Sequence, residues 1–142
     1  MSEREKVVEV LNRLFYYTDH QLWENLKSEV FAEAVTMDVT SLGAPNVEKM
    51  SAQQICDAWK VGFKDLDAIH HQAGTYIINI EGNSASAKAY AIASHYRKDA
   101  SNGNTREFVG SYDFHLQNSD SGWKLDSFKF NLKYMSGNLD LS

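Results

Sequence analysis

The sequence contains one cysteine, Cys56, and one proline, Pro45, among its 142 residues. A single cysteine cannot form a disulfide within the chain, which is typical of a reducing compartment, so we expect a cytoplasmic protein. Internal repeats and low-complexity linkers are also missing. Together with a length that suits one core, this predicts a single domain over residues 1–142.

Basic runs and long apolar runs are absent as well. The formal net charge is -5, which argues against nucleic acid or an anionic membrane surface as a partner. No apolar stretch approaches the roughly 20 residues of a membrane span, and the polar start Met1–Lys6 does not resemble a signal peptide. There is no His-Glu-x-x-His motif, cysteine cluster or glycine-rich phosphate loop, so we expect neither a metal nor a cofactor.

Helical spacing dominates the first part of the chain. Apolar residues at three- and four-residue intervals predict a helix over Ser2–Thr18, and Asp19 can close it and cap a short second helix. Phe31–Ala34 is interpreted as a further helical turn. Ser51–Gln54 is a capping box and predicts a third helix, whose buried stripe includes Trp59.

Strand patterns follow the helices. The predicted strands are Val35–Ser41, Thr75–Ile80, Ser84–Arg97, Arg106–Gln117 and Trp123–Lys133. The apolar residues of the last strand change phase near Asp126, which predicts a β-bulge that bends the sheet. Helices followed by long antiparallel strands indicate an α+β fold with helices on one face of a sheet.

The segment Ser84–Arg97 is the most regular pattern in the chain. Alternate positions carry five alanines, from Ala85 to Ala93, and then His95. Because alternate side chains of a strand share a face, the alanines let a helix lie close and His95 faces a cavity or a polar partner. The opposite face carries Tyr90 and Ile92, and we expect it to form a homodimer interface.

The residues able to carry chemistry are Asp19, His71, His95 and Tyr112, and none of them forms a local motif. Each also has a structural interpretation: Asp19 as a helix cap, His71 as a hydrogen-bonded structural histidine, and Tyr112 as part of the core. Periodicity alone therefore leaves the role of the domain open.

In combination, these positions resemble the nuclear-transport-factor-2-like superfamily, and within it the SnoaL-like branch that holds scytalone dehydratase and the bile-acid 7α-dehydratases. The motifs that carry the resemblance are Asp19-x-x-x-Trp23, Ile69-His-His71-x-x-Gly74, the alanine file ending in His95, Gly110-x-Tyr112-Asp113, Ser121-Gly-Trp123 and Gly137-Asn138. The resemblance covers nearly the whole chain. It implies a cone-shaped fold, in which a curved, mostly antiparallel sheet wraps around the N-terminal helices and a cavity opens at the wide end.

The resemblance also implies a site. His71 corresponds to the general base, Asp19 to its orienting partner, and His95 to an acid or oxyanion donor. The two tyrosines that hold a water in scytalone dehydratase correspond here to Thr18 and Val39, so proton transfer is expected more firmly than dehydration. The expected lining of the ligand pocket is Tyr16, Tyr17, Trp23, Val39, Trp59, Tyr112, Phe128 and Phe130.

Two functions are compatible with these residues. The first is a cofactor-free lyase or isomerase, of the dehydratase or isomerase type, acting on a small apolar carbonyl or hydroxy compound. The alternative is a non-catalytic module that binds a small molecule or a protein, since one fold serves many functions. Three ionisable groups in one family pattern favour the enzyme, and the missing tyrosines favour the binding module.

Overall fold

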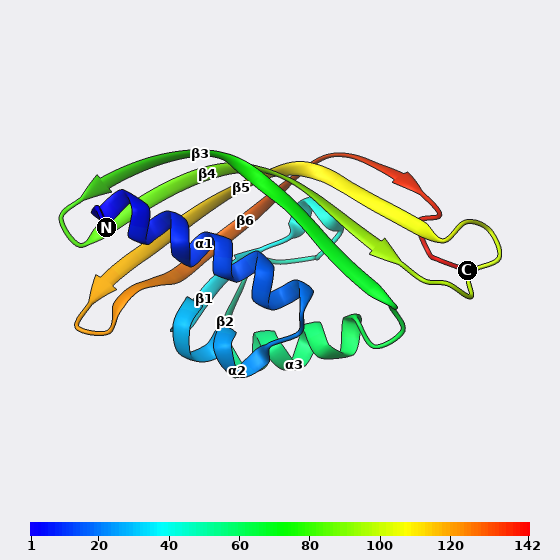
Figure 1. Ribbon diagram of the computed structural model, residues 1–142, viewed down its shortest axis with the longest axis horizontal. Helices are drawn as coiled ribbons and strands as arrows, with labels where there is room; N and C mark the ends of the chain where they lie inside the picture. Colours follow the sequence, from blue (N-terminus) through cyan, green and yellow to red (C-terminus); the bar gives the residue numbers. More distant parts are fainter.

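The computed structural model describes all 142 residues and shows a curved six-stranded sheet that arches over its helices (Figure 1). The helices are α1 (Glu3–Asp19), α2 (Trp23–Asn25) and α3 (Ala52–Gly62), with a π-helical turn at Leu26–Val30 and a 3-10 turn at Thr40–Leu42. The strands are β1 (Phe31–Asp38), β2 (Glu48–Ser51), β3 (Ala68–Glu81), β4 (Ser84–Tyr96), β5 (Thr105–Ser119) and β6 (Gly122–Gly137).

The strand order is β2-β1-β6-β5-β4-β3. Four of the five neighbouring pairs are antiparallel and β1 runs parallel to β6, so the sheet is mixed and mostly antiparallel, as expected. The parallel pair is possible because α3 and three long strands separate β1 from β6 in the chain, whereas a hairpin would impose antiparallel pairing.

Helix α1 is the element around which the sheet curves (Figure 1). The Ser2 side chain accepts a hydrogen bond from the Glu5 backbone N–H at 3.1 Å, which caps the helix. Val7, Leu11 and Leu14 point into the core and are at most 3% exposed. Packing of this apolar stripe, rather than helix propensity, is what holds α1 in place.

The alanine file of β4 lies on the concave side, as predicted. Ala85, Ala87, Ala89, Ala91 and Ala93 are all buried, with exposed fractions of 1–8%. Methyl side chains on this strand, which is second from the edge of the sheet, leave room for α1 and for the larger rings that neighbouring strands direct inward. No helix of the structure is long and apolar enough to cross a membrane.

The sheet is bent where the predicted bulge lies. His115 of β5 pairs with Ser127 and the next residue, Leu116, pairs with Leu125, so Asp126 is the extra residue of β6. A second irregularity in the pairing of β5 with β6 follows at Lys133. Bulges increase local twist and bend a strand, and so they contribute to the curvature of this sheet.

The main differences from the sequence-based expectation lie in β1, β2 and β3. The predicted strand Val35–Ser41 ends at Asp38, and Thr40–Leu42 is a 3-10 turn. Phe31–Ala34 is the start of β1 rather than a helical turn, because Phe31 pairs with β6 and Ala34 with β2. Strand β2 was not predicted. Strand β3 begins at Ala68, earlier than expected. Its pairing with β4 is irregular near Thr75, whose φ is 58°.

Candidate functional site

A cavity of about 240 Å³ lies between α1, α3 and the concave face of the sheet. Twelve of its fifteen lining residues are hydrophobic, and the polar ones are Thr18, His71 and His95. The apolar lining is Leu14, Phe15, Met37, Val39, Leu42, Trp59, Phe63, Ala93, Phe108, Tyr112, Phe128 and Phe130. A mostly apolar pocket with a few polar groups is typical of a small-molecule site.

The predicted contact between Asp19 and His71 is present at the edge of this cavity. Asp19 is the last residue of α1, and its Oδ1 accepts a hydrogen bond from His71 Nδ1 at 2.5 Å. Its Oδ2 accepts a second bond from the His71 backbone N–H at 2.8 Å. Both side chains are nearly buried, with exposed fractions of 11% and 10%. Both carboxylate oxygens therefore bind His71, and its ring cannot rotate freely.

The position of Asp19 is costly for the helix. A carboxylate in the last turn of a helix faces the negative end of the helix dipole, which is unfavourable by about 0.3–1 kcal/mol. The two hydrogen bonds to His71 outweigh this cost. Such a carboxylate is better explained by its effect on the imidazole than by helix capping, because the residue at the C-cap is His20.

The His71 ring faces the cavity through its second nitrogen. In the neutral ring Nδ1 donates its proton to Asp19, so Nε2 carries the lone pair. Nε2 makes no hydrogen bond within the protein, and because no buried polar side-chain atom lacks a partner, Nε2 must be accessible. The ring packs on Phe15 at a centroid distance of 5.3 Å. His71 therefore presents a proton acceptor to an apolar space, with a carboxylate on its far side.

His95 lines the same cavity from β4. Its Nδ1 accepts a hydrogen bond from Arg106 Nε at 3.0 Å, and its ring packs between Phe63 and Phe108 at 5.9 and 5.4 Å. Burial, reinforced by the positive charge of Arg106, lowers the pKa of His95 to about 4. The imidazole is therefore neutral at physiological pH.

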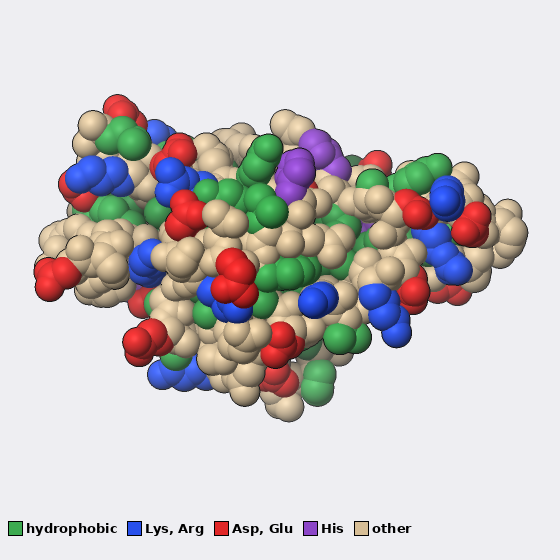
Figure 2. Space-filling model, turned by 60° about the horizontal axis from the view of Figure 1, so that its bottom comes forward, with side chains coloured by type: hydrophobic (Ala, Val, Ile, Leu, Met, Phe, Trp, Pro, Cys, Tyr) green, Lys and Arg blue, Asp and Glu red, His purple; other side chains and the backbone are tan.

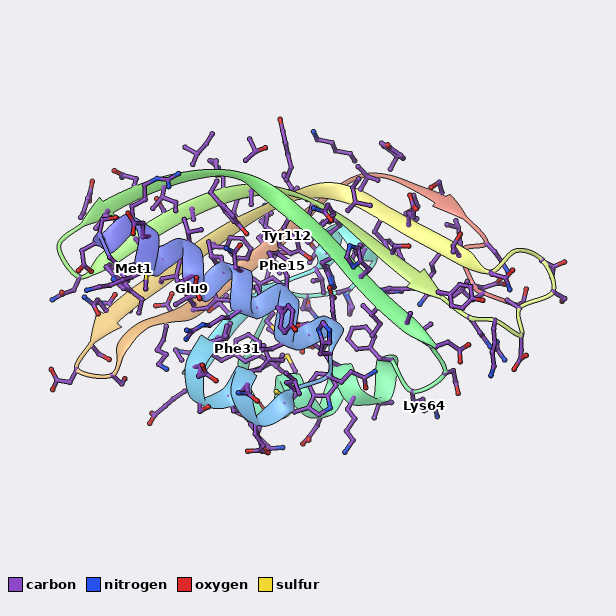
Figure 3. The ribbon with its side chains drawn as sticks, viewed as in Figure 1. Met1, Glu9, Phe15, Phe31, Lys64 and Tyr112 are labelled. Carbon is purple, nitrogen blue, oxygen red and sulfur yellow. The ribbon has the colours of Figure 1, made fainter.

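Tyr112 adds a phenol hydroxyl to the largely apolar wall of the cavity. Phe15 and Tyr112 point toward one another in the space between α1 and β5 (Figure 3), with ring centroids 5.5 Å apart. Burial, together with the negative charge of Asp19, raises the pKa of Tyr112. Its hydroxyl makes no hydrogen bond within the protein, yet no buried polar side-chain atom lacks a partner. The hydroxyl must therefore contact the open space of the cavity.

Five of the eight predicted lining residues border the cavity, and three do not. Val39, Trp59, Tyr112, Phe128 and Phe130 are in place. Tyr16 points to solvent and is 59% exposed, while the Tyr17 hydroxyl donates to Glu29 at 3.0 Å outside the cavity. Trp23 stacks on Phe63 at a centroid distance of 6.5 Å and is not part of the cavity lining. Neither Tyr16 nor Tyr17 replaces a missing water-holding tyrosine.

Thr18 has a hydroxyl beside the cavity, but its hydrogen is already used. It donates to the Leu14 carbonyl of the preceding helical turn at 2.6 Å. Val39 offers no polar group at all. The two positions that correspond to the water-holding tyrosines of scytalone dehydratase therefore supply no free donor.

Other lining residues were missed from the sequence. Phe108 is in phase with Tyr112 on β5, so its place on the inner face was visible in the alternation. Leu42 and Met37 depend on how β1 and its following turn cross the sheet. No local signal indicated Arg106. No group of three or more His, Cys, Asp or Glu side chains is gathered where it could hold a metal ion.

The surface around the helices has no dominant charge. Lysine and arginine side chains lie among aspartate and glutamate over the face shown in Figure 2, with hydrophobic groups between them. Nothing on this face suggests a polyanionic partner.

Comparisons with known proteins agree with this architecture. The solved structures with a similar fold include the Kfla4162 protein of Kribbella flavida, with a TM-score of 0.93, 23% identity, and coverage of 98% of this chain and 95% of that one. A provisionally assigned scytalone dehydratase from Novosphingobium aromaticivorans has a TM-score of 0.81, 14% identity, and coverage of 96% and 87%. A hexachlorocyclohexane dehydrochlorinase from Novosphingobium barchaimii has a TM-score of 0.76, 11% identity, and coverage of 95% and 89%.

At these identities the solved structures establish the fold alone, and one of them, from Salmonella enterica, is named as a protein of the nuclear-transport-factor-2-like superfamily. No curated protein sequence matches the chain. The model of the SnoaL-like domain matches residues 1–129, which is most of the sequence and includes Asp19, His71 and His95. The chain therefore belongs to the SnoaL-like domain family.

Proposed function

We propose that this protein is a cofactor-free lyase or isomerase that removes a proton from a small, largely apolar carbonyl or hydroxy compound. The observation that carries the proposal is the Asp19–His71 pair, whose free Nε2 faces an apolar cavity. A base on one side of a cavity with a neutral imidazole and a phenol elsewhere in its wall is an arrangement for proton transfer.

Asp19 supports His71 in two ways. Its carboxylate selects the tautomer with the lone pair on Nε2, and it stabilises the imidazolium that forms when Nε2 takes a proton. The apolar walls strengthen this interaction, because charges attract more strongly where water is scarce. A positioned base of this kind typically contributes about 10²–10⁴ to the rate.

The cavity bounds the size of the substrate. A cavity of about 150 Å³ lined by apolar side chains can hold benzene, and this one measures about 240 Å³. Aromatic side chains form much of its wall, among them Phe15, Trp59 and Phe108. A flat compound of one or two rings fits this space best.

The names of two similar structures describe eliminations. A dehydratase and a dehydrochlorinase each remove a proton and a leaving group from neighbouring atoms, and proton removal is the step that the Asp19–His71 pair supports. Dehydration itself has less support, because Thr18 and Val39 offer no hydroxyl to hold the water. Proton abstraction is therefore the core of the proposal, followed by elimination or by return of the proton.

Deuterium exchange into a panel of one- and two-ring ketones tests the proposal, with NMR following loss of the proton beside the carbonyl. His71→Asn should lower the exchange rate by about 10²–10⁴. The matched control is His70→Asn, since His70 is exposed and bonds only Gln72. If a ketone whose exchange the wild-type protein accelerates exchanges equally fast with His71→Asn, the role of His71 as base is wrong.

A binding module remains the second candidate, favoured by the absence of free hydroxyl donors at Thr18 and Val39. In that case ketones of the panel would bind with a stoichiometry of one per chain, but the protein would not accelerate exchange. Calorimetry and exchange on the same compounds separate the two functions.

A further inference from the structure

We propose that Arg106 is a positioning residue that fixes His95 as a neutral hydrogen-bond donor, so that the site is built for an enolisable carbonyl compound. The inference about the substrate rests on the proposed function, whereas the state of His95 follows from geometry alone. Arg106 does not line the cavity and acts only through His95.

The pairing of two strands brings these residues together. His95 of β4 and Arg106 of β5 are direct partners in the antiparallel register, and Arg106 Nε lies 3.0 Å from His95 Nδ1. A guanidinium nitrogen can only donate, because it stays protonated and has no lone pair to offer. His95 Nδ1 must therefore be the acceptor, and the ring proton of the neutral imidazole must be on Nε2.

A short segment after β6 holds Arg106 in this orientation. Arg106 Nη1 donates to the Leu139 carbonyl at 3.0 Å, while Nε contacts His95. Gly137 has a φ of 89° and turns the chain sharply, and a side chain there would meet the Thr105 carbonyl oxygen at 2.4 Å. Leu141 is buried and anchors the segment. The guanidinium is thus held from two sides.

The charged groups around His95 favour its neutral form. Arg106 from β5 opposes a positive charge on His95, as does His71 from β3 once it is protonated, and only Asp19 from α1 favours one. Burial adds to the opposition, and together these effects hold the pKa of His95 near 4. At neutral pH almost no imidazolium is present, so His95 does not serve as a general acid but can still donate a hydrogen bond.

The two histidines therefore offer opposite groups to one ligand. His71 Nε2 is an acceptor and His95 Nε2–H is a donor, and both nitrogens lack partners in the protein. A carbonyl compound with an acidic neighbouring C–H bond satisfies both. Alcohols without a carbonyl group offer no such acidic C–H bond and leave the donor with no developing negative charge to stabilise.

The chemical step is enolisation. The C–H bond beside the carbonyl breaks, its proton goes to His71 Nε2, and its electron pair becomes the carbon–carbon double bond of an enolate. The carbonyl π pair moves to oxygen, where the His95 Nε2–H bond stabilises the negative charge. The imidazolium of His71 then returns the proton to another carbon, or a leaving group departs with its electron pair as the carbonyl re-forms.

The state of His95 is measurable without any substrate. Two-bond ¹H–¹⁵N correlation spectra of histidine-labelled protein identify the protonated nitrogen of each ring. Between pH 5.5 and 8, we expect His95 to stay neutral with its proton on Nε2 in the wild-type protein. A proton on Nδ1, or titration with a midpoint near 6.5, would overturn the proposal.

Arg106→Leu removes the donor and the charge but keeps an apolar stem. We expect a mixture of the two His95 tautomers and a higher titration midpoint, which stays below 6.5 because burial remains. Arg97→Leu is the matched control, since Arg97 Nη1 donates to the Leu141 carbonyl of the same segment but does not contact His95. Should both variants leave the tautomer of His95 unchanged, Arg106 has no positioning role.

The spectra also separate this inference from the proposed function. If His95 has the expected tautomer but no ketone exchanges, the state of the ring stands and the enzyme proposal fails. If ketones exchange but His95 titrates near 6.5, the enzyme proposal stands and the inference about the state of His95 fails. When both assays work, Arg106→Leu should lower the exchange rate about 10-fold or more at unchanged fold, as judged by circular dichroism, and Arg97→Leu should not.

Discussion

Replacing Asp19 by Asn tests the buried pair at the centre of the site. In the wild-type protein both carboxylate oxygens accept from His71, one from the ring and one from the backbone. Asn has only one acceptor oxygen, and its amide nitrogen is a donor. If the oxygen stays on the backbone N–H, the amide meets Nδ1, and the imidazole must move its proton to Nε2. The variant therefore presents a donor instead of a base to the cavity.

The energetic effect follows from the same contacts. A hydrogen bond to a charged group contributes about 1.5–3 kcal/mol. Removing the negative charge from the end of α1 stabilises the helix by about 0.3–1 kcal/mol. The other tautomer of His71 can still bond the Asn side chain, which restores part of the lost contact. We expect Asp19→Asn to lower the free energy of unfolding by about 1–2 kcal/mol. At about 2–4 °C per kcal/mol for a chain of this size, the melting temperature falls by about 2–8 °C.

A second aspartate–histidine pair on the outer face of the sheet provides the control. Asp126 Oδ1 accepts from His115 Nδ1 at 2.6 Å, but these side chains are 32% and 42% exposed. Water can replace that contact, so Asp126→Asn should change the free energy of unfolding by less than about 1 kcal/mol. Urea denaturation compares the variants, and ¹⁵N spectra report the His71 tautomer. Equal stability of both variants, with the His71 tautomer unaltered in Asp19→Asn, would refute this reasoning.

Two further predictions concern acid stability and assembly. Because the pKa of His95 is lowered from its ordinary value of 6.5 to about 4, the unfolded chain binds a proton in this window that the folded chain does not. The free energy of unfolding should therefore fall by about 1–2 kcal/mol from pH 6.5 to pH 4, allowing for solvent screening, and urea denaturation should show a smaller fall in His95→Asn. We also propose a homodimer through the outer sheet face, where Tyr90 and Ile92 are 55% and 41% exposed, so light scattering should give twice the chain mass of 16.1 kDa. Ile92→Asp should yield monomers whereas Val61→Asp on α3 should not, and a wild-type mass near 16 kDa would contradict the dimer.

Local pattern was sufficient for much of the fold. The three-to-four spacing before Asp19 identified α1, the Ser51 capping box identified the start of α3, and the phase change at Asp126 identified the bulge. Each of these signals depends on residues close together in the chain. Sequence reasoning therefore recovers them without knowing what packs against them.

Phe31–Ala34 shows where local pattern failed. Its alanines and glutamate suit a helix, but pairing with β2 and β6 makes it a strand, because hydrogen bonding to two neighbours outweighs a weak helical preference. The start of β3 at Ala68 has the same origin, since its residues pair with the end of β4. Neighbours distant in the sequence decided both segments.

The site divides in the same way. Sequence by itself identified Asp19, His71 and His95 through a family pattern, and alternation placed His95 on the alanine face of its strand. Only the tertiary structure brought Arg106 against His95, because that contact depends on the register of β4 and β5 and on the segment after β6. Residue types set which groups are available for chemistry, but the proton positions that give them opposite roles depend on contacts between distant parts of the chain.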